Sequence, residues 1–329
     1  MIFLTIIIVL VLIFDFINGF HDSANSIACV VSTKVLSPLA AVSMAAFFNF
    51  IAFLVFHLKV ASTIGKGVVE PDVINMNVIG AALVAAIIWN LLTWWWGLPS
   101  SSSHTLVGGL MGAAIASSGV GSILFSGVFK IVIFIFIAPF LGFIVAFFLS
   151  SVIMWIFRKV PPFSVDKWFR RFQVVSASAF SLGHGGNDAQ KSMGIIWVAM
   201  IISGLVEKDA LRPPNWVVFA CYSAIALGTL FGGWRIVKTM GQRITKLKPF
   251  EGFCSETAGS LTLFAATHWG IPVSTTHTIT GAIMGVGARK GASAVKWGVT
   301  RKIFIAWIVT IPVSGIIGAF MYLIFKWLN

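Results

Sequence analysis

Charged residues are scarce in this sequence. Asp, Glu, Lys and Arg together make up 10% of the 329 residues, whereas about 25% is usual in a soluble domain. With so few charges the chain could not cover a water-facing surface, so a single soluble core is excluded. Hydrophobic residues make up 58%, in runs that recur along the whole chain. Because a bilayer-spanning helix needs roughly 20 apolar residues, the composition predicts an all-α integral membrane protein.

Acidic residues are the rarer of the two charge signs, with 10 against 23 basic residues and a net charge of +13. On a soluble protein this charge would indicate nucleic acid. Here five Lys or Arg residues fall in each of three short segments between apolar runs, 158–171, 235–248 and 289–302. Basic segments separated by membrane spans are typical of cytoplasmic loops. The expected partner is therefore the lipid bilayer and not nucleic acid.

Cysteine is also rare. Cys29, Cys221 and Cys254 are scattered in apolar sequence, so they form neither a disulfide framework nor a metal-binding motif. The first apolar run has no Lys or Arg before it and no small-residue cleavage site after it. It is therefore expected to be the first membrane helix and not a cleaved signal.

The apolar runs predict about ten transmembrane helices plus two shorter re-entrant helical hairpins. They lie at about 2–17, 37–58, 76–96, 105–118, 123–157, 174–182, 193–206, 216–234, 257–267, 279–288 and 303–328. The run 123–157 is too long for one span, so it is expected to hold two, with a turn near Pro139 or Gly142.

The chain also contains an internal repeat. The segment Trp96–Gly112 aligns without gaps on Trp269–Gly285, and Gly19–Ser26 aligns more weakly on Gly185–Ser192. Both elements occur in the same order in each half. The sequence therefore predicts two repeats, 1–157 and 172–329, joined by a basic cytoplasmic linker at 158–171.

Loop charge indicates how the two repeats are oriented. The loops 235–248 and 289–302 are basic, but their first-half counterparts near 62–82 and 116–129 carry few or no basic residues. Equivalent loops on the same side of the membrane should have similar charge, so the halves are expected to be inverted. Inverted repeats with short, interrupted helices near the centre are typical of secondary transporters.

Each copy of the stronger repeat contains a Pro followed by hydroxyl residues, His and Thr. Pro and Ser or Thr suit the start of a helix, and such a start offers unpaired backbone N–H groups and a partial positive charge. Two such starts face to face would suit a tetrahedral oxyanion. The predicted anion-binding hydroxyl groups are those of Ser101, Ser102, Ser103, Thr105, Ser274, Thr275, Thr276 and Thr278. The alternative is that these residues only cap or pack helices.

Glycines follow both segments at a spacing of four, Gly108 with Gly112 and Gly281 with Gly285. This spacing predicts close helix packing. His104 and His277 occupy equivalent positions in the repeat. They are candidates for a proton relay, with a purely structural hydrogen-bonding role as the alternative.

Ionisable residues at membrane depth are costly and therefore indicate function. Asp22 and Asn25 are three residues apart, as are Asp188 and Lys191, so each pair shares a helix face. The carboxylates, with Asn25 and Asn187, suit a hard cation. Lys191 could bind an anion directly or neutralise Asp188. Glu256, which precedes a long apolar stretch, is a further candidate for cation coupling as a proton carrier; capping of helix ends is the alternative for the Asp pairs.

At these residues the chain resembles the PiT family of inorganic phosphate transporters. Gly19, Asp22, Ala24 and Asn25 match the first copy of that family's duplicated signature, and Gly185, Asn187 and Asp188 match the second. The resemblance implies an inverted-repeat fold with two helical hairpins, a homodimer, and phosphate uptake with a coupled cation in a bacterial-type cell membrane. It also implies that Asn25, Asn187 and the two aspartates serve phosphate or cation binding.

His21 and Lys191 depart from the signature and look more like the proton-coupled bacterial branch, so H⁺ is expected in preference to Na⁺. The leading hypothesis is a phosphate symporter that is not an enzyme and needs no cofactor or resident metal. A transporter of another oxyanion or of a metal–phosphate complex remains open, as does a passive anion channel. An intramembrane hydrolase is disfavoured because Ser101, Ser103 and His104 neighbour one another on one predicted helix.

Overall fold

The computed structural model describes residues 2–56, 58, 67–207, 212–271 and 273–328. These residues are almost entirely helical, and a lone bridge between Val69 and Ile123 is their only β-type pairing. The long helices are α1 (Ile2–Ser32), α2 (Pro38–Ile51), α4 (Met76–Trp96), α5 (Ser102–Ser118), α6 (Phe125–Ile156), α7 (Pro162–Ile202), α8 (Asn215–Phe231), α10 (Pro249–His268), α11 (Thr275–Arg289) and α12 (Trp297–Leu328). Short helical turns are η1 (Ala52–Leu54), η2 (Pro71–Val73), η3 (Val120–Ser122), α9 (Trp234–Lys238), η4 (Thr239–Arg243) and η5 (Ala292–Ala294).

Four described helices, α1, α4, α6 and α12, are long and apolar enough to cross a bilayer. A fifth span results if α8 is counted together with α9 and η4, which follow it after a 61° bend. The all-α membrane class is thus confirmed, whereas the count of about ten spans is not. Helices α2, α5, α8 and α11 are 17 residues long or shorter, below the roughly 20 residues of a full span, and α7 carries the basic segment at its start.

Two expectations about the helices were wrong. The run 123–157 forms one continuous helix, α6, with Pro139 inside it. Neighbouring helices can compensate for the hydrogen bond that a proline removes within a membrane helix. The first helix does not end near residue 17 but continues to Ser32, so Asp22 and Asn25 lie within it. The predicted linker 158–171 stays a prediction; the structure shows that it is helical from Pro162 onward, as the first part of α7.

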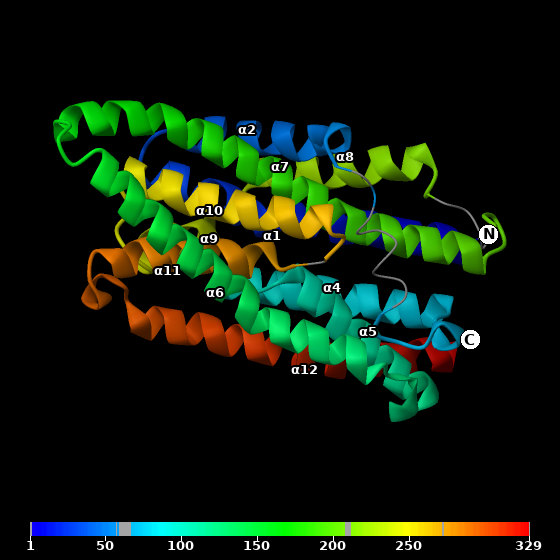
Figure 1. Cartoon of the computed structure of the whole chain (residues 1–329). Helices are drawn as coiled ribbons and strands as arrows, with labels where there is room; N and C mark the ends of the chain where they lie inside the picture. Colours follow the sequence, from blue (N-terminus) through cyan, green and yellow to red (C-terminus); the bar gives the residue numbers. More distant parts are fainter. Residues whose placement is uncertain (1, 57, 59–66, 208–211, 272, 329) are drawn as a thin grey trace.

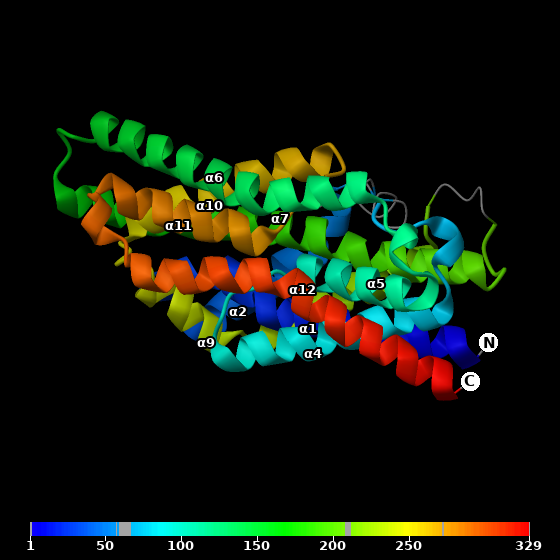
Figure 2. The same ribbon diagram turned by 90° about the horizontal axis from the view of Figure 1, so that it is seen from below.

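Two helical hairpins approach the centre of the molecule from opposite ends (Figure 1). In the first, α4 ends at Trp96 and is capped by Gly97, whose φ of +66° is the left-handed conformation that favours glycine. Helix α5 then begins at Ser102. In the second, α10 is followed by α11 after a similarly short break. The α4–α5 hairpin lies toward the end that carries both chain termini, and the α10–α11 hairpin lies toward the other end (Figures 1 and 2). The three basic segments are at that other end (Figure 1).

The long final helix of each half packs against the hairpin of the opposite half, α6 on α11 and α12 on α5. Glycines make these contacts close. A Cβ at Gly281 would lie 2.0 Å from the Pro139 carbonyl oxygen, and one at Gly112 would lie 1.8 Å from the Gly315 carbonyl oxygen. The packing role predicted for the spaced glycines is therefore confirmed. The exchange of helices brings both hairpin tips into one buried centre.

Candidate functional site

Both hairpins begin their second helix with the same cap. The Ser101 hydroxyl accepts a hydrogen bond from the His104 backbone N–H at 3.3 Å, and the Ser274 hydroxyl accepts one from His277 at 3.3 Å. Thr105 and Thr278 donate to the backbone carbonyls of those same serines, at 2.9 and 3.0 Å. These four hydroxyl groups thus order the first turns of α5 and α11.

The remaining hydroxyl groups of the tips face α1 and α7, which cross the centre as unbroken helices. Ser102 donates to the Asp22 carboxylate at 3.4 Å, and Thr275 donates to the Asp188 carboxylate at 3.2 Å. Ser102 and Thr275 occupy equivalent positions in the repeat, as do the two aspartates. Each half therefore makes the same acid–hydroxyl contact within itself.

A second pair of contacts crosses between the halves. The Asn25 amide donates to the Thr276 hydroxyl at 2.9 Å, and the Lys191 ammonium donates to the Ser103 hydroxyl at 2.5 Å. Asn25 and Lys191 are equivalent in the repeat, and so are Thr276 and Ser103. Asn25 also donates to Thr275 at 3.3 Å, and Lys191 to the Val273 carbonyl at 3.1 Å. The contacts thus join both hairpin tips to both crossing helices.

Charge is distributed unequally over this frame. Lys191 forms a buried ion pair with Asp188 on α7. Asp22 has instead the imidazole of His21, with Nδ1 2.5 Å from the carboxylate; the other nitrogen lies 3.1 Å from the Thr93 hydroxyl. Asn187, the counterpart of His21, donates to the Thr267 hydroxyl at 3.1 Å. The Oδ1 atoms of Asn25 and Asn187 are buried without a hydrogen-bond partner among the described residues.

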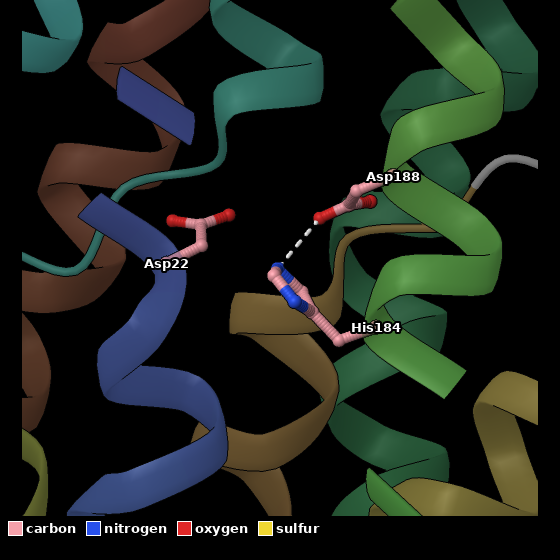
Figure 3. Close-up of side chains that lie close together, drawn as sticks. All are labelled: Asp22, His184 and Asp188. Carbon is pink, nitrogen blue, oxygen red and sulfur yellow. Dashed lines mark ion pairs between the residues drawn. The ribbon is translucent and has the colours of Figure 1, made fainter. Parts of the chain in front are cut away.

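Sequence reasoning missed one central residue, His184. Its Nε2 lies 3.2 Å from the Asp188 carboxylate (Figure 3). Its Nδ1 lies 3.1 Å from Asn49 Oδ1. Ligand atoms of Asp22, His184 and Asp188 all lie within 4.8 Å of one another, the one such group of acids and imidazoles among the described residues. Figure 3 shows Asp22 on α1 facing the other two on α7. The signal was present, because His184 precedes Asp188 by four residues and shares its helix face.

The two repeat histidines meet each other. The ring centroids of His104 and His277 are 4.8 Å apart, and His277 stacks on Trp307 at 3.9 Å. Neither ring has a hydrogen bond to Asp22 or Asp188 within the part of the chain described here. A proton relay through these rings stays a prediction.

Glu256 lies apart from the centre. Its carboxylate accepts hydrogen bonds from Ser176 at 2.6 Å and from Gln173 at 3.4 Å, where α10 packs on α7. Twelve residues separate it from the end of α10 at His268, which corresponds to roughly 18 Å of helix. The structure therefore groups Asp22 with Asp188 but places Glu256 in a separate buried cluster.

The sequence of this chain is similar to those of known phosphate transporters. The profile of the phosphate transporter family (PHO4) matches residues 18–318. The chain belongs to this family. A relative from Rhizobium meliloti (strain 1021), described as a probable low-affinity inorganic phosphate transporter, is 56% identical over 96% of this chain and 94% of its own length. One from Bacillus subtilis (strain 168), with the same description, is 45% identical over 98% and 97%.

A solved structure described as the sodium-dependent phosphate transporter superposes on this family member with a TM-score of 0.88. The superposition covers the full length of both chains at 26% sequence identity. The resemblance to phosphate transporters seen in the sequence motifs is thereby confirmed, and so is the helical membrane fold. The curated relatives are named as transporters and not as enzymes.

Proposed function

We propose that this phosphate transporter family member imports inorganic phosphate by symport, with the substrate held between the tips of the two hairpins. The crossed contacts carry the proposal, because Asn25 with Thr276 and Lys191 with Ser103 bring two helix starts from opposite halves to one place. Each helix start contributes backbone N–H groups and a partial positive charge. Such a pair suits an oxyanion with little full charge from the protein.

The phosphate oxygens would be bound by four hydroxyl groups, those of Ser102, Ser103, Thr275 and Thr276. Asn25, Asn187 and Lys191 would add amide and ammonium donors. Ser101, Thr105, Ser274 and Thr278 would act through position, because their hydroxyl groups already bind their own helices. Lys191 would give up its hydrogen bond to the Ser103 hydroxyl and donate to a phosphate oxygen instead. The new bond is stronger because a phosphate oxygen is a charged acceptor and the hydroxyl is a neutral one.

Asp22 and Asp188 would couple phosphate to the cation, and we propose H⁺ as that cation. The support is charge: the Lys191 ammonium already lies against Asp188, and the His21 imidazole against Asp22. The Lys191 ammonium occupies a position beside Asp188 that a hard metal ion would need, whereas its counterpart Asn25 carries no charge beside Asp22. His104 and His277 would relay protons at the hairpin tips, although no bond joins them to the aspartates.

Glu256 is proposed as a separate proton carrier, since its carboxylate is buried and has only the neutral partners Ser176 and Gln173 among the described side chains. Glu256→Gln should impair proton-driven uptake while leaving phosphate binding intact. Equilibrium binding of labelled phosphate to the purified variant checks this. A loss of binding as large as the loss of uptake would contradict a carrier role.

The proposed architecture is an inverted repeat of 1–157 and 172–329 about the segment 158–171, in the cell membrane, as a homodimer. The opposite approach of the hairpins and the location of all basic segments at one end support the inversion, with that end cytoplasmic. Native mass spectrometry of the detergent-solubilised protein checks the dimer, which a purely monomeric mass would exclude.

Uptake of labelled phosphate into proteoliposomes tests the function. A proton gradient, acid outside, should drive accumulation above the external concentration, which a passive channel cannot do. Absence of uptake under both proton and sodium gradients would contradict the proposal. Unlabelled arsenate should compete because it resembles phosphate in shape and charge, and sulfate should compete less.

Sodium is the second candidate for the coupled cation. The buried, unpartnered Oδ1 atoms of Asn25 and Asn187 favour it, since amide oxygens bind hard cations, as does the similarity to a sodium-dependent transporter. A metal–phosphate complex as substrate would use the same acid and imidazole group. Uptake that requires Na⁺ at every pH would overturn the proton assignment, and uptake that requires a divalent metal would favour the complex.

A further inference from the structure

A cavity of about 650 Å³ lies beside the central site. Helices α4, α5, α6 and α7 surround it, together with Trp269–Ile271 at the tip of the second hairpin. Its lining runs from Val68 and Leu124, which lie beside η3, to Ser103 and Lys191 at the centre. We call this cavity the vestibule. Its outer part adjoins the turn between α5 and α6. That turn lies toward the end of the molecule that carries the termini, away from the three basic segments (Figure 1).

The vestibule is lined mainly by aliphatic side chains and glycine, and among the described residues its only charged lining residues are Lys130 and Lys191. Within the part of the chain that the structure describes, no carboxylate lines it. Lys191 is paired with Asp188, whereas no acidic group in the described part of the chain lies within ion-pair distance of Lys130. The vestibule therefore has an uncompensated positive charge on the path to the anion site.

Lys130 is also a charged residue in an otherwise uncharged, apolar helix. It is the only charged residue in the 32 residues of α6, and a lysine in such an apolar helix is costly unless it reaches water. An interfacial lysine can reach water by extending along the helix. Lys130 is exposed and also lines a cavity in the protein, which indicates a role in the vestibule beyond anchoring the helix at the membrane surface.

We propose that Lys130 is an outer anion-binding residue that draws phosphate into the vestibule before it reaches Lys191. The inference rests on the proposed transport of phosphate. An anion that leaves water for an apolar passage loses hydration, and one fixed positive charge lowers that barrier and raises the local anion concentration. Lys130 would act on the entry of phosphate and not on the later transport steps. Its removal should therefore change KM and the salt dependence of KM but not the maximal rate.

Lys130→Gln tests this in the proteoliposome assay, with Lys130→Arg as the charge-conserving variant. Lys302→Gln is the matched control, because Lys302 is the sixth residue of α12 as Lys130 is of α6, and it is exposed outside the vestibule. At low ionic strength Lys130→Gln should raise KM for phosphate roughly threefold to tenfold and leave the maximal rate within about twofold. The difference should shrink in about 0.5 M salt.

Lys130→Arg should retain the wild-type KM, and Lys302→Gln should change it little. An unchanged KM in Lys130→Gln at low salt would overturn the proposal, and so would an equal rise in Lys302→Gln. Either result would leave the proposed transport function standing, because wild-type uptake in the same assay tests that function separately.

A second measurement does not require transport. Ser126 also lines the vestibule, and the three native cysteines are buried. The quantity measured is the rate at which an anionic, sulfonate-bearing methanethiosulfonate modifies the introduced thiol of the Ser126→Cys protein, divided by the rate for a cationic, trimethylammonium-bearing one. This ratio should be higher in the Ser126→Cys protein than in the protein that also carries Lys130→Gln. We expect the rate ratio to fall at least about twofold. An unchanged ratio would show that Lys130 does not act on anions there, even if uptake were absent altogether.

Discussion

The two halves of the molecule build the same frame around the centre and fill it with different charges. In the first half Asp22 is contacted by Ser102, and in the second Asp188 is contacted by Thr275. At the next equivalent position, however, the first half carries neutral Asn25 and the second carries Lys191. The shared contacts fix where an anion can be held, whereas the unshared charge bears on which cation accompanies it.

The largest expected difference between the halves concerns the two aspartates. Asp188→Asn leaves the Lys191 ammonium buried without its carboxylate, which costs about 3–5 kcal/mol when one partner of a buried pair is removed. Asp22→Asn removes hydrogen bonds to His21 and Ser102 and leaves no fixed charge unpaired, at about 1–3 kcal/mol. Thermal unfolding in detergent compares them. Equal losses would show that the Lys191 pair does not distinguish the halves.

Lys191→Asn removes the distinction directly by giving both halves an asparagine. Asp188 then lacks its fixed cation, so external Na⁺ should stimulate uptake that it did not stimulate before. Loss of charge-assisted hydrogen bonds to Ser103 and Asp188 should lower proton-driven uptake roughly 10-fold to 150-fold, in keeping with about 1.5–3 kcal/mol. Uptake measured across Na⁺ and pH gradients checks both effects. Coupling identical to that of the wild type would refute the role given to Lys191.

Helix packing should respond alike in both halves. Gly112→Ala brings a methyl group against the backbone of α12, and Gly281→Ala brings one against the backbone of α6. In each variant the free energy of unfolding should fall by about 1–3 kcal/mol, because the added methyl group overpacks the contact. Gly298→Ala is the control, because a Cβ there meets nothing within 4 Å. Unfolding measurements that find only one hairpin sensitive would argue against equivalent packing of the two.

The sequence predicted the parts of the site that depend on local pattern. The two caps, the glycine packing and the pairing of Asp188 with Lys191 all follow from short spacings, since helix geometry determines which neighbours share a face. The acid–hydroxyl and crossed contacts could be anticipated only as a meeting of the tips. Their partners are up to 251 residues apart and are brought together by the exchange of α6 and α12 between halves.

Other features were out of reach for physical reasons. Whether a proline ends a helix depends on what its neighbours supply, so Pro139 gave no reliable boundary. Glu256 was grouped with the aspartates because all are acids in apolar surroundings, yet its place along α10 sets it near Ser176. Asn49, the partner of His184, lies on α2 in no motif at all. Only the fold brings it to the site.

The smallest effects are expected at the caps, where the two halves do not differ. Ser101→Ala and Ser274→Ala each remove the side-chain acceptor for one backbone N–H at the start of α5 or α11, and each should cost about 1 kcal/mol. Threonine at either position should restore most of the stability, because it keeps the hydroxyl group.

If the cap acts only through position, the alanine variants should also weaken phosphate binding modestly and equally. Labelled-phosphate binding and thermal unfolding, measured on both variants, check this. A strong loss of binding at Ser101 alone would mean that the first tip contacts the substrate through its cap, and the symmetry of the frame would then not extend to the substrate.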